Sequence, residues 1–137
     1  LVMFIWSKRT IFISHAYNSD RHYKNLLVAW DKNDLFDIEF YDGSVTVPVN
    51  STKAGPIRRV ISQKIARSSH LLCIVGTESY KSEWVKWEVE KAVELGKKII
   101  AVKTAKSNTT PPALYGVGAD WALSFTLAGI KKAIDKS

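Results

Sequence analysis

Short apolar runs alternate with amphipathic segments along this chain, and this alternation limits the possible folds more than any other feature. The runs HLLCIVG (residues 70–76) and KKIIAVK (residues 97–103) show no polar alternation. Uninterrupted apolar strands are typical of a parallel sheet that helices cover on both faces. Segments with helical spacing separate these runs. The sequence therefore predicts an α/β domain with a parallel sheet between two helical layers.

The expected elements can be placed in chain order. Strands are predicted at residues 9–16, 37–43, 70–76, 97–103 and, more weakly, 119–125. Helices are predicted at residues 21–33, 57–68, 81–96 and 126–137, with Pro56 in the first turn of the second helix. This order predicts a flavodoxin-like three-layer domain with a five-stranded parallel sheet of strand order 2-1-3-4-5. A chain of 137 residues without internal repeats is expected to form a single domain, residues 1–137.

Composition narrows the class of protein. No apolar run is long enough to cross a bilayer, and the N-terminal LVMFIW is too short for a signal peptide. The single cysteine, Cys73, lies inside an apolar run and is expected to be an inert core thiol, as in a reducing cytoplasm. The net charge of +7 comes from dispersed lysines and arginines, so specific nucleic-acid binding is not expected. We expect a cytoplasmic protein without membrane association.

One carboxylate stands out in the third predicted helix. At about 100° per residue, its apolar stripe consists of Val85, Val89, Ala92, Val93 and Gly96. Glu88 lies on the flank of this stripe, one turn after Trp84, and is expected to be partly desolvated. The alternative is an ordinary surface glutamate that pairs with Lys86 or Lys91.

The fold rule for such sheets places ligands beyond the carboxyl ends of the strands. It selects three segments: SHAYNSD (residues 14–20), DGS (42–44) and TESYKSEW (77–84). Glu88 follows the third segment and is expected to face the same crevice.

Several chemistries can be excluded from the residues present. The third strand does not end in an aspartate, as a phosphoacceptor receiver requires, and residues 14–20 contain no glycine for a flavin phosphate loop. No dinucleotide or P-loop fingerprint is present. His15, His22 and His70 do not have ligand spacing with Cys73, so no metal site is expected. What remains is one carboxylate among hydroxyls and aromatic rings, which suits cleavage of an N-ribosyl bond to a cationic pyridine.

Three stretches together resemble a known family. IFISHAYNSD (residues 11–20) resembles the first strand of TIR domains, and SEWVKWEVEKA (82–92) resembles their pattern of a tryptophan followed four residues later by glutamate, here Trp84 and Glu88. GKKIIAV (96–102) is similar to the bacterial TIR-like subfamily of Thoeris anti-phage ThsB proteins. The resemblance spans residues 9–102 and implies a TIR-like fold.

The resemblance also implies an activity. In enzymatic TIR domains the matching glutamate cleaves NAD to ADP-ribose or a cyclic isomer, so Glu88 would be catalytic, with NAD as substrate and no further cofactor. The residues that would bind substrate or border it are Ser14, His15, Tyr17, Asp20, Asp42 and Trp84, with Asp20 shaping the loop after the first strand. The segment 43–56 corresponds to the region that TIR domains use for self-assembly, although the usual arginine-aspartate-proline-glycine pattern is absent.

A protein of this kind would convert NAD into an ADP-ribose-derived nucleotide signal during anti-phage defence, and the signal would act on a separate effector protein. Two alternatives stay open from the sequence. One is a non-catalytic TIR-type interaction module that recruits partners through residues 44–56. The other is a nucleoside or deoxyribosyl transferase, which also places a glutamate against an anomeric carbon.

Overall fold

A five-stranded parallel sheet forms the centre of the computed structural model, which describes residues 9–31, 36–40 and 47–137. Its strands are β1 (Arg9–Ser14), β2 (Phe36–Phe40), β3 (His70–Val75), β4 (Lys98–Lys103) and β5 (Asp120–Ala122). Their order in the sheet is β2-β1-β3-β4-β5, with every neighbouring pair parallel. The predicted flavodoxin-like class and strand order are therefore confirmed.

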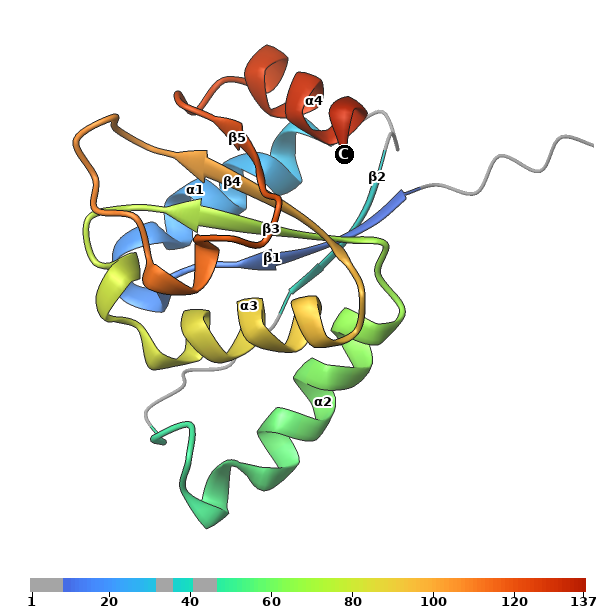
Figure 1. The fold of residues 1–137 in the computed structure, drawn as a ribbon, viewed down its shortest axis with the longest axis vertical. Helices are drawn as coiled ribbons and strands as arrows, with labels where there is room; N and C mark the ends of the chain where they lie inside the picture. Colours follow the sequence, from blue (N-terminus) through green and yellow to red (C-terminus); the bar gives the residue numbers. More distant parts are fainter. Residues whose placement is uncertain (1–8, 32–35, 41–46) are drawn as a thin grey trace, which may run out of the picture.

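Four α-helices cover the two faces of the sheet. They are α1 (Tyr17–Trp30), α2 (Gly55–Ala66), α3 (Glu83–Glu94) and α4 (Leu127–Lys136). Figure 1 shows α1 and α4 on one face and α2 and α3 on the other. Within the described ranges, no helix has the length and apolar character required to span a membrane.

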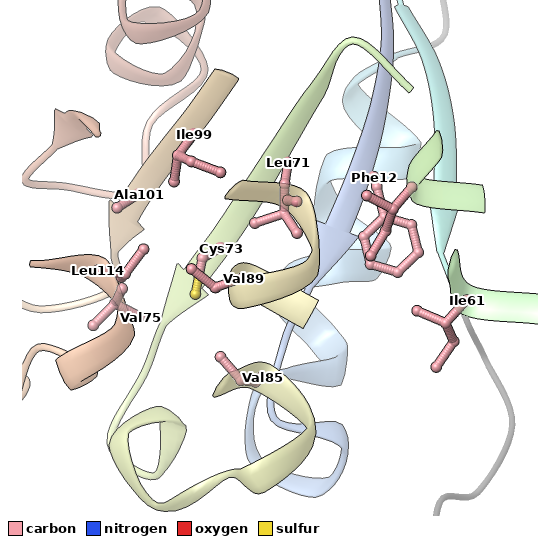
Figure 2. Packing of buried hydrophobic residues seen from close by; sticks show 12 residues of the cluster. Phe12, Ile61, Leu71, Cys73, Val75, Val85, Val89, Ile99, Ala101 and Leu114 are labelled. Atoms are coloured by element: carbon pink, nitrogen blue, oxygen red, sulfur yellow. The ribbon is translucent and has the colours of Figure 1, made fainter. Parts of the chain in front are cut away.

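The apolar runs supply the core, as their lack of alternation predicts. All six residues of β3 are buried, because α3 packs on one of its faces and α1 on the other. Figure 2 shows Val85 and Val89 of α3 beside Cys73 and Leu71 of β3. Burial raises the pKa of the Cys73 thiol far above its ordinary value, which makes it the inert core residue expected.

Two local differences from the sequence prediction affect the site. Helix α1 begins at Tyr17, four residues before the predicted start, because residues 17–20 contain no helix breaker and Asp20 suits the positive end of the helix dipole. In α3 the buried arc is centred closer to Glu88 than predicted: Glu88 is 7% exposed, whereas Val93 is 43% exposed. The packing of α3 therefore turns Glu88 inward at the expense of Val93.

Candidate active site

A cavity of about 360 Å³ lies at the carboxyl ends of β1 and β3. At this point the connection from β1 leads through α1 to one side of the sheet, and the connection from β3 leads through α3 to the other, as Figure 1 shows. Such switch points are the usual ligand sites of open α/β sheets. The cavity is lined by Ile13, His15, Ala16, Tyr17, Asn18, Ser19, Glu78, Lys81, Ser82, Trp84 and Glu88.

Helix α3 places Glu88 in the lining of this cavity. The helix begins after Ser82, whose Oγ accepts a hydrogen bond of 3.1 Å from the backbone N–H of Val85. Val85, Val89 and Ala92 are fully buried against the sheet, which fixes the rotation of the helix about its axis. Glu88 is therefore held in the second turn between the core and the cavity.

The carboxyl group of Glu88 has a single described side-chain partner. The hydroxyl of Ser14, itself fully buried at the end of β1, donates a hydrogen bond of 2.7 Å to Glu88 Oε1. Burial raises the pKa of Glu88 to about 8, and the Ser14 hydrogen bond opposes this rise. A solitary carboxyl with a pKa near neutrality is typical of a group with a chemical role.

Two lysines near Glu88 form ion pairs with other carboxylates instead. Lys81 and Glu78, both in the cavity lining, pair with each other at 3.2 Å and are more than half exposed. Lys91, which the sequence offered as a surface partner for Glu88, instead contacts Glu94 at 3.0 Å. Among the described residues, the causes that shift the pKa of Glu88 are burial and the Ser14 hydroxyl. A cation bound in the cavity would therefore stabilise the carboxylate.

The Ser14 hydrogen bond can be tested by its effect on titration. Replacing Ser14 by alanine removes a donor to the carboxylate, so the pKa of Glu88 should rise further above about 8. The measurement is a ¹³C carboxyl titration by NMR. The control is Ser68→Ala, which removes another buried hydroxyl, bonded to the Lys64 carbonyl before the start of β3. An unchanged titration in Ser14→Ala would contradict the assigned hydrogen bond.

The other predicted site residues differ in where they lie relative to the cavity. His15, Tyr17 and Trp84 line the cavity beside Glu88, and Ser14 lies behind Glu88. The Trp84 indole N–H donates a 3.0 Å hydrogen bond to the Val47 carbonyl. Asp20 is buried against Ser79 and does not line the cavity. Asp42 lies outside the described residues, as does part of the predicted assembly segment 43–56.

Several lining residues were not singled out from the sequence. Asn18, Ser19, Glu78, Lys81 and Ser82 all come from segments that the strand-end rule had selected. The sequence prediction began this helix at residue 21. A predicted start at residue 17, where α1 begins in the structure, would have placed Asn18 and Ser19 in its first turn, beside the cavity. In the part of the chain that the structure describes, no three His, Cys, Asp or Glu side chains form a cluster that could hold a metal ion.

Comparisons with known proteins give a family and a fold. No curated protein sequence matches the chain significantly. Among solved structures, the CMP N-glycosidase BcmB of Clostridium botulinum superposes with a TM-score of 0.63 at 12% identity, over 93% of this chain and 99% of that one. A 2-deoxyribosyltransferase of Bacillus psychrosaccharolyticus superposes with a TM-score of 0.54 at 13% identity, over 74% and 77% of the two chains. At these identities the likeness shows the shared fold.

A sequence family matches most of the chain. The family described as Thoeris protein ThsB, TIR-like domain, matches residues 12–109, which include the second half of β1, the Trp84 to Glu88 motif and the whole cavity lining. The protein therefore belongs to the TIR-like domain family of Thoeris ThsB proteins.

Proposed function

We propose that this protein cleaves the bond between nicotinamide and ribose in NAD, with Glu88 as the catalytic carboxylate. The observation that carries the proposal is the buried Glu88 carboxyl, held at the cavity by one neutral hydroxyl donor. Its place at the switch point of a ThsB-type TIR-like domain supports the assignment.

The reaction needs little beyond a positioned negative charge. The bond between the ribose C1′ and the pyridinium nitrogen breaks, and its electron pair stays on nitrogen, so nicotinamide leaves as a neutral molecule without a general acid. The ribose becomes oxocarbenium-like, and a carboxylate close to it stabilises the positive charge that develops. Water that captures C1′ loses a proton and gives ADP-ribose. An internal nucleophile at the same carbon gives a cyclic isomer.

The electrostatics of the cavity favour a cationic substrate over a neutral one. With a pKa of about 8, Glu88 is mostly protonated at neutral pH in the free protein. A pyridinium bound nearby would favour the ionised carboxyl and lower this pKa. A neutral nucleoside or nucleotide base offers no such compensation. The same site would thus act on NAD more readily than on CMP or a deoxyribonucleoside.

The biological role follows as part of the proposal. Products of NAD cleavage would serve as a nucleotide signal in anti-phage defence, read by a separate effector protein in the cytoplasm. Self-assembly through residues 43–56 would be one way to switch the enzyme on.

The experiment is a substrate panel with product identification. Concentrated protein is incubated with NAD, CMP, cytidine and deoxyribonucleosides, with and without lysate of phage-infected cells, and products are resolved by HPLC and mass spectrometry. We expect nicotinamide and an ADP-ribose isomer from NAD, and slower or no cleavage elsewhere. Preferential cleavage of CMP or deoxyribonucleosides would contradict the NAD assignment. Inactivity on every substrate, even with lysate, would favour the non-catalytic interaction module.

A further inference from the structure

A second buried carboxyl group, that of Asp20, lies outside the cavity lining and contacts Ser79, so that it connects two segments that form the walls of the cavity. One wall is the first turn of α1, which contributes Tyr17, Asn18 and Ser19 to the lining. The other is the connection from β3 to α3, which contributes Glu78, Lys81 and Ser82. We propose that Asp20 is a positioning residue that holds these walls together through Ser79 and so sets the width of the nucleotide cleft. This inference rests on the proposed function.

The contacts of Asp20 are those of a structural link. Asp20 is 2% exposed and Ser79 is 1% exposed, although both carry polar side chains. Their side chains meet at 3.1 Å between Ser79 Oγ and Asp20 Oδ2, across 59 residues of sequence. A buried polar group that loses its hydrogen-bond partner destabilises the local structure, so this contact favours one spacing of the two walls.

Ser79 is itself fixed to the end of β3. Its Oγ accepts a 2.8 Å hydrogen bond from the Gly76 N–H and lies 2.9 Å from the Ile74 carbonyl oxygen. The short 3-10 helix Ser79–Lys81 then leads to the start of α3. The link therefore runs from α1 through Ser79 to the central strand of the sheet.

Gly76 provides the space that the carboxyl group occupies. A Cβ built on Gly76 would overlap the Asp20 carboxylate, the nearest side chain to that position. Any larger residue at position 76 would displace the Asp20 carboxyl group from its place beside Ser79. The absence of a side chain at Gly76 and the burial of Asp20 are thus two parts of one arrangement.

The hydrogen bonds of Ser79 can be compared with the donors and acceptors that a serine hydroxyl offers. Such a hydroxyl has one proton to donate and two lone pairs to accept hydrogen bonds. Ser79 Oγ accepts from the Gly76 N–H, and both the Asp20 carboxylate and the Ile74 carbonyl oxygen lie within hydrogen-bond distance of Ser79 Oγ. Burial raises the pKa of Asp20, and the Ser79 hydrogen bond opposes this rise. An asparagine side-chain oxygen can accept the same hydrogen bond, which makes Asp20→Asn the conservative variant.

The first test measures the link without using activity. Amide hydrogen exchange of Asp20→Ala and Ser79→Ala should be faster across residues 76–82, Gly76 above all, because its N–H donates to Ser79. Ser68→Ala is the matched control, since it also removes a buried hydroxyl bonded to a backbone carbonyl, at the opposite end of β3. Exchange in residues 76–82 that rises no more in Ser79→Ala than in Ser68→Ala would overturn the proposal.

The second test uses NAD kinetics. Asp20→Ala and Ser79→Ala should raise KM about five- to tenfold, as expected for one lost hydrogen bond that holds the binding walls. The effect on kcat should be smaller, and the pH profile set by Glu88 should not move. Asp20→Asn, in contrast to Asp20→Ala, should keep KM and amide protection close to those of the parent. A rescue by Asn that fails, or faster exchange without a change in KM, would contradict the role in setting the cleft.

The two tests separate this inference from the proposed function. If the parent protein releases no nicotinamide even with lysate of phage-infected cells, the NAD assignment fails, and amide exchange alone decides whether Asp20 and Ser79 join the walls. If NAD is cleaved but the exchange of residues 76–82 is unaffected in both variants, the link fails while the NAD assignment holds. Ser79→Ala keeps the test open should Asp20→Ala not fold.

Discussion

Replacing Glu88 by glutamine should reduce NAD turnover by at least about 10²–10³-fold, the usual loss when one electrostatic stabiliser of a transition state is removed. Glutamine keeps the shape of the side chain and an oxygen that can accept the Ser14 hydrogen bond. It lacks the negative charge that stabilises the developing ribosyl cation. The loss should appear in kcat as well as in kcat/KM, because the interaction is made mainly in the transition state. Nicotinamide release, followed by HPLC, gives both constants.

The control for this variant is Glu90→Gln. Glu90 lies on the same helix, two residues later, with an exposed side chain outside the cavity lining. Both variants replace one carboxyl group of α3 by the same amide, so any general effect of this substitution on the helix is shared. Turnover by Glu88→Gln that equals that of Glu90→Gln would show that the chemistry does not depend on the buried carboxyl group.

The same substitution should stabilise the protein at alkaline pH. Glu88 has a pKa of about 8 in the folded protein against an ordinary value of 4.5, so between these pH values the folded state binds more protons than the unfolded state. The contribution of Glu88 to the free energy of unfolding therefore falls as the pH rises from 4.5 to about 8. This contribution is complete only below the pKa of the unfolded state. Glutamine does not titrate. At pH 9 the variant should be more stable than the parent by on the order of 4 kcal/mol.

This prediction is checked by urea unfolding at pH 5 and pH 9. The quantity of interest is the change in the free energy of unfolding of Glu88→Gln relative to the parent, because other titrating groups contribute equally to both. The difference should be small at pH 5 and large at pH 9. Glu90→Gln should follow the parent at both pH values. A difference in the free energy of unfolding that is the same at pH 5 and pH 9 would mean that the pKa of Glu88 is not raised in the folded protein.

Much of the fold could be predicted because its signals are local. The apolar run at β3 and the run at β4 identify buried strands without knowledge of the rest of the chain. Short helical connections between them require parallel pairing, from which the strand order followed. The predicted burial of Glu88 rested on its angular position beside the apolar stripe of α3, and its exposure of 7% bears this out.

What could not be predicted depends on contacts between distant residues. Ser14 and Glu88 are 74 residues apart, and no local pattern indicates that the hydroxyl donates to the carboxyl group. The role of Asp20 was interpreted as shaping a loop, whereas the structure places it in α1 against Ser79. The space left by Gly76 becomes visible only when α1 is packed beside the end of β3.

The most direct test of the account is the pH dependence of kcat/KM for NAD, measured on the parent and on Ser14→Ala. This ratio reports the ionisation of the free enzyme. Since the carboxylate is the active form, kcat/KM should rise with pH and level off above about 8 in the parent. In Ser14→Ala the same limb should move to higher pH. A profile that is flat between pH 6 and 9, or identical in the two proteins, would contradict catalysis by a buried Glu88 carboxylate.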